Sequence, residues 1–95
     1  MTRTPQENTI MQRLKDLAIS RTGFVFDPYS GATFSANPSA VCILEGLREG
    51  LDRSCITDML RVRFDAPSDD IARDIDDLVQ SLRLYGLAPT DWEVP

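Results

Sequence analysis

The side chains of this 95-residue chain that could do chemistry are two cysteines and a group of aspartates, and histidine is absent. Without histidine the usual general base is missing, and neither a Ser/His/Asp nor a Cys/His arrangement can be assembled. The glycines do not form a G-x-G-x-x-G motif or another phosphate-binding loop. We therefore expect no catalytic residue, no cofactor-binding residue and no cofactor.

The aspartates that could bind a metal ion or transfer protons are Asp69, Asp70, Asp74, Asp76 and Asp77. At helical spacing their carboxylates spread around the polar side of a helix and do not converge on one point. The segment also lacks the glycine-centred loop of an EF-hand. A solvated helix face is the favoured interpretation, and a partner-binding surface is the alternative. No metal site is expected.

The cysteines, Cys42 and Cys55, stand in apolar runs with helical spacing and form no C-x-x-C pair. Free cysteine is among the most buried residue types. We therefore expect both thiols to be reduced and buried in the core, with a disulfide or metal site as the remote alternative.

The composition places the chain among small globular domains. No apolar run approaches the roughly 18–20 residues of a membrane span, and the first residues lack the apolar core of a signal peptide. We expect a cytoplasmic location and no contact with a membrane. The net charge of −5 repels phosphates, so no nucleic-acid partner is expected either.

Residues 6–19 carry apolar side chains at helical spacing, which predicts a helix to about Asp16 and an extended segment from Leu17. Residues 23–38 predict a β-hairpin whose four-residue loop lies between Asp27 and Ala32 and ends on Gly31. Closing on this loop produces the following pairs: Phe26 with Thr33, Val25 with Phe34, and Phe24 with Ser35.

The two faces of this hairpin are both partly apolar. One face has Val25, Ala32, Phe34 and Ala36, and the other has Phe24, Phe26, Thr33 and Ser35. We expect the following helices to cover one face, and the N-terminal helix or a partner chain to cover the other.

Three helices are predicted after the hairpin. Asn37 and Pro38 form a helix start, and Gly50 ends that helix. Asp52 or Ser54 caps the second helix, and Ser68 caps the third. The apolar stripe of the third helix is Ile71, Ile75, Leu78, Leu82 and Tyr85, and Gly86 with Leu87 predicts a Schellman end.

The predicted fold class is α+β: a small N-terminal antiparallel sheet of about three strands, then a three-helix bundle in a winged helix-turn-helix-like order, with an extra N-terminal helix. We divide the chain into an N-terminal arm (1–16), a folded domain (17–88) and a flexible tail (89–95).

The second strand of the hairpin, residues 32–36, has no charge, no proline and no glycine. Soluble proteins usually protect exposed strand edges with such residues, because unpaired backbone groups recruit other chains. An undefended edge is either covered, by the N-terminal segment or by a second copy of the chain, or used to bind a peptide as an added strand.

The sequence resembles the PqqD family of small peptide chaperones over about residues 13–88. The resemblance is carried by Leu17-Ala18-Ile19-Ser20, Gly23 to Pro28, Ser30-Gly31, Thr33-Phe34, Asn37, Ala40 and Ile43-Leu44, and by residues 56–87, which end on Gly-Leu. It implies a recognition element that does no chemistry itself. Such a protein binds the leader segment of a ribosomally made precursor peptide and presents the precursor to a modifying enzyme, often a radical S-adenosylmethionine (SAM) protein.

The resemblance also implies where the peptide binds. The leader would add beside the third strand and lie against the third helix. Carried onto this chain, the strand residues are Ala32, Thr33, Phe34, Ser35 and Ala36, and our expected groove wall is Arg73, Asp74, Asp77, Leu78 and Ser81. Arg73 is the expected charge contact.

Two features depart from the family pattern. Ala36 stands where the family commonly has a larger aliphatic residue, and the N-terminal helix is longer than the domain needs. The alternative functions are a homodimeric scaffold with paired edge strands and, less favoured, a winged-helix DNA-binding regulator. Residues 68–77 carry five acids and one base, which argues against the regulator.

Overall fold

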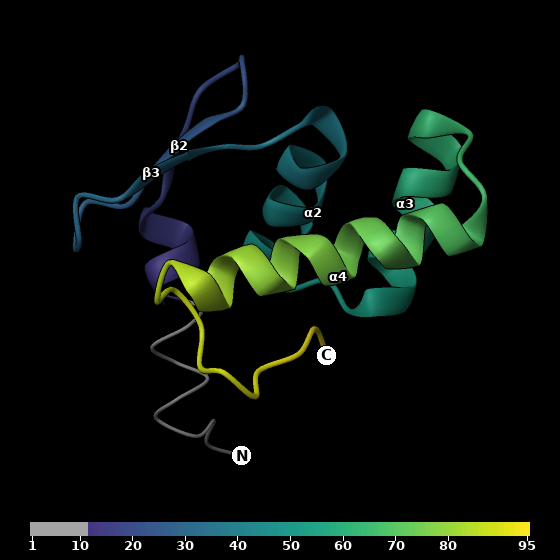
Figure 1. The fold of residues 1–95 in the computed structure, drawn as a ribbon. Coiled ribbons are helices and arrows are strands. Elements are labelled where there is room, and N and C mark those ends of the chain that lie inside the picture. The colour runs from purple at the N-terminus through teal and green to yellow at the C-terminus, as the bar shows by residue number, and fades with distance from the viewer. Residues whose placement is uncertain (1–11) are drawn as a thin grey trace.

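The computed structural model describes residues 12–95, in which a three-stranded antiparallel sheet is followed by three helices (Figure 1). The predicted α+β class and the order of its elements are confirmed. Residues 12–16 are helical, as predicted for the end of the N-terminal helix. The first part of that predicted helix, residues 6–11, lies outside the described residues.

The sheet is built from β1 (Ala18–Ile19), β2 (Phe24–Phe26) and β3 (Thr33–Ser35), in that order. The three predicted pairs between β2 and β3 are confirmed residue by residue. β1 pairs with the other side of β2, where Ile19 lies opposite Val25. β3 is therefore an edge strand of the sheet among the described residues.

The two faces of the sheet differ more than the sequence predicts. Val25 is fully buried and Phe34 is half-buried on the face that meets the helices. On the opposite face Phe24 is 49% exposed, and Thr33 and Ser35 are also exposed. The cover expected for this second face, from the N-terminal helix or a partner chain, stays a prediction. The hydroxyl side chains of this face tolerate water, and Phe24 and Phe26 are its only large apolar residues.

Gly23 determines where the hairpin ends. Its φ of +88° is a left-handed conformation that favours glycine. A Cβ atom at this position would lie 2.0 Å from the carbonyl oxygen of Ala36. The close approach allows the Ala36 N–H to donate to the Gly23 carbonyl at 2.7 Å, which fixes the end of the β3 segment against β2.

The helices are α2 (Pro38–Arg48), α3 (Arg53–Phe64) and α4 (Ser68–Leu84). Asn37 caps α2 by accepting a hydrogen bond from the Ala40 N–H at 2.8 Å, and Asp52 caps α3 in the same way through Cys55. Ser68 does not cap α4, contrary to the prediction. The N-cap is Pro67, and the Ser68 hydroxyl instead accepts a hydrogen bond from Arg61 at 2.8 Å.

The core lies between the inner face of the sheet and the three helices, which pack against one another. The predicted α4 stripe is buried from Ile71 to Leu82, but its last member, Tyr85, is 38% exposed because it lies past the end of the helix. Figure 1 shows α4 crossing α2, with the sheet beside the C-terminal half of α4. The predicted Schellman end of α4 is confirmed by hydrogen bonds from Gly86 and Leu87.

The segment after α4 folds back on the helices. Val94 is buried, Trp92 is half-buried, and the Trp92 carbonyl accepts a hydrogen bond from Arg83 at 2.5 Å. The Arg53 N–H donates to the carbonyl of Pro95 at 2.7 Å. The flexibility expected for residues 89–95 stays a prediction. Motion of this segment would require these contacts to break.

Candidate functional site at the β3 edge

The backbone groups of β3 alternate between β2 and the open edge. Asp27 donates to Ala32, and Ala36 donates to Gly23, so these two pairs are hydrogen-bonded pairs of the antiparallel ladder. The alternation makes Val25 and Phe34 the hydrogen-bonded pair between them. The N–H and C=O groups of Thr33 and Ser35 therefore point away from β2, toward the open edge.

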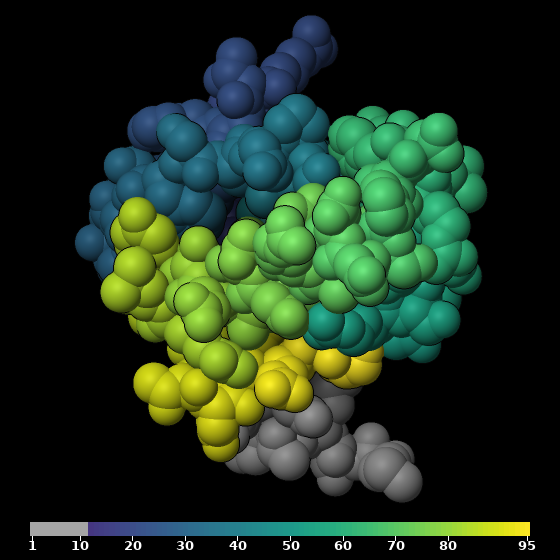
Figure 2. All heavy atoms as spheres, turned by 45° about the vertical axis from the view of Figure 1, so that its right-hand side comes forward, coloured from purple at the N-terminus to yellow at the C-terminus, as the bar shows by residue number. Residues whose placement is uncertain are grey.

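Beside this edge the surface is hollowed by a groove of about 150 Å³ between β3 and α4. Figure 2 shows this face, with the hairpin (blue) next to α4 (light green). The lining residues come from the strand, the start of α2 and the middle of α4: Phe34, Ser35, Ala36, Asn37, Ala40, Asp74, Asp77, Leu78 and Ser81. Four of the five expected wall residues thus meet three of the five expected strand residues.

The remaining expected site residues lie elsewhere. Arg73 is exposed and does not line the groove, although it is next to Asp74 in the sequence. Thr33 is exposed on the outer face of the sheet, and Ala32 lies before β3, where its carbonyl accepts a hydrogen bond from Asp27. Thr33 can contribute its outward backbone groups to the edge. Both backbone groups of Ala32 are already bonded, its carbonyl to Asp27 and its N–H to the Ser30 hydroxyl. Neither residue lines the groove.

An aromatic pair that the sequence did not predict lies at one end of the groove. The rings of Phe34 and Tyr85 stack with centroids 4.8 Å apart and an interplanar angle of 12°. Tyr85 was assigned to the core stripe because it continues the helical spacing. The stack joins the end of α4 to β3, and the spacing of residues along α4 does not show which strand residue Tyr85 meets.

The groove is acidic away from this stack. Asp74 is half-buried and Asp77 is exposed, and neither makes an ion pair with another described residue. Their neighbour Asp76 points elsewhere and pairs with Arg53 at 3.0 Å. The aspartates of α4 therefore divide between a groove wall and a solvated face. The alternative of a partner-binding surface stays a prediction for the two that line the groove.

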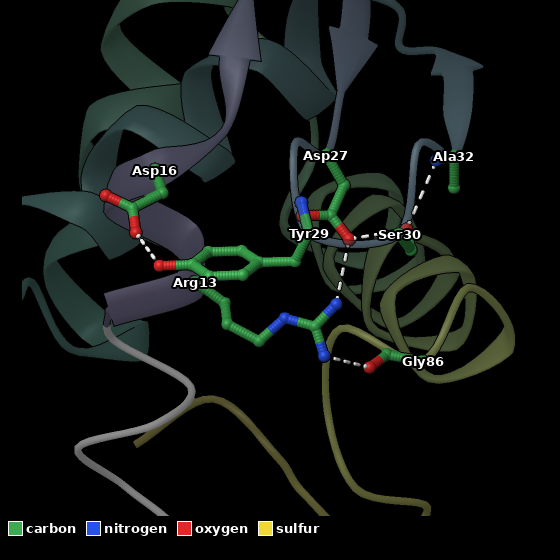
Figure 3. A network of polar contacts seen from close by, with 7 residues as sticks. All are labelled: Arg13, Asp16, Asp27, Tyr29, Ser30, Ala32 and Gly86. Atoms are coloured by element: carbon green, nitrogen blue, oxygen red, sulfur yellow. Dashed lines mark hydrogen bonds and ion pairs between the residues drawn. The ribbon is translucent and has the colours of Figure 1, made fainter.

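A partly buried ion pair holds the hairpin loop in place (Figure 3). Arg13 donates to the fully buried carboxylate of Asp27 at 2.8 Å and to the carbonyl of Gly86 at 2.8 Å. Asp27 also accepts hydrogen bonds from the Ser30 hydroxyl at 2.6 Å and from the Tyr29 N–H at 3.1 Å. The network connects the N-terminal helix, the loop before β3 and the end of α4.

The carboxyl of Asp27 is held in its charged form by this network. Burial alone would raise its pKa, but the hydrogen bonds from Ser30 and Tyr29 and the nearby Arg13 guanidinium together lower the pKa below its usual value. The sequence identified Asp27 only as a turn residue. Its partner Arg13 is 14 positions away and belongs to another element, so only the packed structure brings the two together.

The predicted burial is confirmed for one of the two cysteines and not for the other. Cys42 is buried as expected, and its sulfur lies 3.8 Å from the Arg63 guanidinium. Cys55 is exposed, so its predicted burial is wrong: α3 turns Ile56 and Leu60 to the core and leaves Cys55 on the flank of its first turn. The hydrogen bond with Asp52 and the Asp52 charge raise the pKa of the Cys55 thiol.

A larger hollow of about 430 Å³ lies on the other side of Ala36, between the β1–β2 turn and the helices α2 and α3. The residues that line it include Arg21, Glu45, Arg63 and Phe64.

Within residues 12–95, no group of three cysteine or acidic side chains could hold a metal ion. No helix in that range is long and apolar enough to cross a membrane.

Comparison with protein families shows what the chain is similar to. A family model described as "Coenzyme PQQ synthesis protein D (PqqD)" matches residues 23–88, from the start of β2 to the residues that end α4. The match contains β3, α4 and every residue of the groove. No curated protein and no solved structure matches the chain significantly.

Proposed function

The chain belongs to the PqqD family, and on this basis we propose that it is a peptide-binding protein without catalytic activity of its own. In this proposal it binds the leader segment of a ribosomally made precursor peptide as an added β-strand. It then presents the precursor to a modifying enzyme, for which a radical SAM protein is the proposed class. The family's association with cofactor synthesis fits such an accessory role.

One observation carries the proposed mode of binding: the backbone groups of Thr33 and Ser35 point to an open edge beside a groove. A peptide that lies along this edge can form hydrogen bonds with all four of these groups. Such backbone bonds depend little on the peptide's sequence, and each contributes on the order of 1 kcal/mol. Side chains that enter the groove would supply the selectivity.

The proposed binding residues follow from this arrangement. We keep Ala32, Thr33, Phe34, Ser35 and Ala36 as the proposed strand contribution. The last three of these line the groove together with the proposed wall residues Asp74, Asp77, Leu78 and Ser81. Arg73, the originally expected charge contact, would reach the peptide only beyond the groove. We therefore assign it a peripheral role.

Proline substitutions at the edge test the proposal directly. Thr33→Pro and Ser35→Pro each remove an outward N–H, whereas Thr33→Ala and Ser35→Ala change the side chain and keep the N–H. Peptides selected by the wild-type chain from a random ten-residue display library serve as ligands. We expect the proline variants to raise Kd at least about tenfold, and the alanine variants to change it about twofold or less.

The fold of each variant is checked by circular dichroism and by two-dimensional NMR. Phe34→Pro is a useful contrast, because the Phe34 N–H faces Val25 and its loss should disrupt the hairpin itself. If the selected peptides bind folded Thr33→Pro and Ser35→Pro variants as tightly as the wild type, strand addition at β3 is wrong.

A further inference from the structure

The two ends of the groove have different chemistry, and this difference extends along α4. The Phe34–Tyr85 stack forms the aromatic end. Since a helix rises about 1.5 Å per residue, Asp77 and Asp74 lie roughly 12 and 16 Å from Tyr85 along α4. They line the groove together with Asn37 and Ala40, which follow β3. The acidic end of the groove is therefore near Ala36.

The edge also sets which side chains of an added strand face this groove. In either strand direction, the side chains of peptide residues opposite Thr33 and Ser35 would lie on the outer face of the sheet. The residues opposite Phe34 and Ala36 would turn toward α4. These two positions are two residues apart in the peptide, at a spacing of about 7 Å.

We propose that this site selects peptides in which a lysine or arginine and an apolar residue are two positions apart. The apolar side chain would pack beside Phe34 and Tyr85, and the cation would reach Asp74 and Asp77 from the position opposite Ala36. The proposal rests on the proposed strand addition at β3 and names the chemistry of the ligand.

Three observations favour a cation at that position. Asp74 and Asp77 have no ion-pair partner among the described residues, so a ligand cation does not have to displace one. Ala36 contributes only a methyl group to the groove that Asp74 and Asp77 also line. A carboxylate placed there would meet two like charges on a chain of net charge −5.

The order of the two residues reports the direction of the bound peptide. An antiparallel peptide passes Ala36 before Phe34, so its sequence reads basic-x-apolar. A parallel peptide passes Phe34 first and reads apolar-x-basic. The selected sequences therefore identify the strand direction as well as the composition.

The test repeats the library selection with full-length variants. For the wild type we expect basic and apolar residues to be enriched at a fixed spacing of two. For Asp74→Asn/Asp77→Asn we expect the apolar preference to persist and the basic preference to disappear. Single peptides from the wild-type selection should lose about three- to tenfold in affinity for this double variant.

A matched control separates local contact from general attraction to an acidic protein. Asp69→Asn/Asp70→Asn changes the net charge by the same amount at exposed positions outside the groove. This control should retain the basic preference at the fixed spacing. Equal loss in both double variants would overturn the inference.

Different results would overturn this inference and the proposed function. Selected peptides that need the Thr33 and Ser35 N–H groups but show no basic residue at that spacing would overturn the inference alone. Selected peptides that bind Thr33→Pro and Ser35→Pro normally would overturn the strand addition on which it rests.

Discussion

At the scale of single residues, the pair Arg13–Asp27 joins the N-terminal helix, the hairpin loop and the end of α4. Asp27 is the only fully buried acidic residue described, and it keeps its charge because three donors surround it. Asp16 and Asp52 also have lowered pKa values, through hydrogen bonds from Tyr29 and from Cys55 respectively. Folding is therefore linked to the ionisation of these three carboxylates.

Replacing Asp27 with asparagine should lower the free energy of unfolding at pH 7 by about 2 kcal/mol, since a buried charge-assisted network loses its acceptor charge. Because the pKa of Asp27 is lowered by folding, its contribution is complete above the unfolded pKa of about 3.9. It is lost as the pH falls through the lower folded value. Urea unfolding between pH 7 and pH 3 should therefore show a smaller loss of stability with acid for Asp27→Asn than for the wild type.

A residual acid dependence is expected in that variant, because Asp16 and Asp52 still titrate. If the wild type and Asp27→Asn lose stability equally over this pH range, Asp27 does not carry the linkage that the network indicates.

At the scale of elements, β3 is held where its edge can serve a ligand. β2 binds one side of it, the loop from Asp27 fixes its start, and the Gly23–Ala36 hydrogen bond fixes its end. α4 then lies beside it through the Phe34–Tyr85 stack. These contacts hold the strand segment that carries the outward groups of Thr33 and Ser35.

Gly23→Ala should disturb this arrangement strongly. The substitution adds left-handed strain and places a methyl group against the Ala36 carbonyl, so we expect a loss of at least about 2 kcal/mol in the free energy of unfolding. Gly31→Ala is the matched control, since its φ of +76° is similar but no atom lies within 4 Å of the added Cβ. It should lose about 1 kcal/mol. Thermal and urea unfolding measure both, and equal losses would contradict the close-approach argument.

At the scale of the whole molecule, the open edge admits either a peptide or a second copy of the chain. Two copies of net charge −5 repel one another, whereas a peptide with a basic residue does not. We expect sedimentation equilibrium to show a one-to-one complex of the 10.6 kDa chain with a selected peptide. The homodimeric scaffold would be favoured instead if the chain forms a dimer that persists when peptide is added but falls apart in the Thr33→Pro variant.

The hairpin and the helix starts were predictable because they depend on local chemistry. Pro28 and Gly31 define the loop length, and the loop length fixes the register from Phe24 to Ser35. Asn37 and Asp52 act on N–H groups three positions away. Ser68 shows the limit of this reasoning. Serine is a common N-cap residue and stands at the start of α4, yet the N-cap is Pro67, and the Ser68 hydroxyl accepts a hydrogen bond from Arg61.

The candidate groove was predictable only in part. The family resemblance pointed to β3 and α4, and helical spacing suggested the side of α4 that flanks the core stripe. Arg73 was assigned to the wall but does not line it, while Tyr85 was assigned to the core but stacks on Phe34. Both residues lie at the margin of the apolar stripe of α4. At such a position, a small rotation of the helix about its axis decides whether a side chain faces the groove or the solvent.

The sequence by itself determined the fold class, the hairpin register, the caps of α2 and α3, and the uncharged character of the edge, because each depends on residues a few positions apart. Only the tertiary structure decided that Arg13 reaches both Asp27 and Gly86, that Cys55 is exposed, and that Asp74 and Asp77 line the groove whereas Asp76 does not. These contacts join elements that are distant in the chain. Their geometry is set by how helices cross and pack on the sheet, which the spacing of residues along one element does not contain.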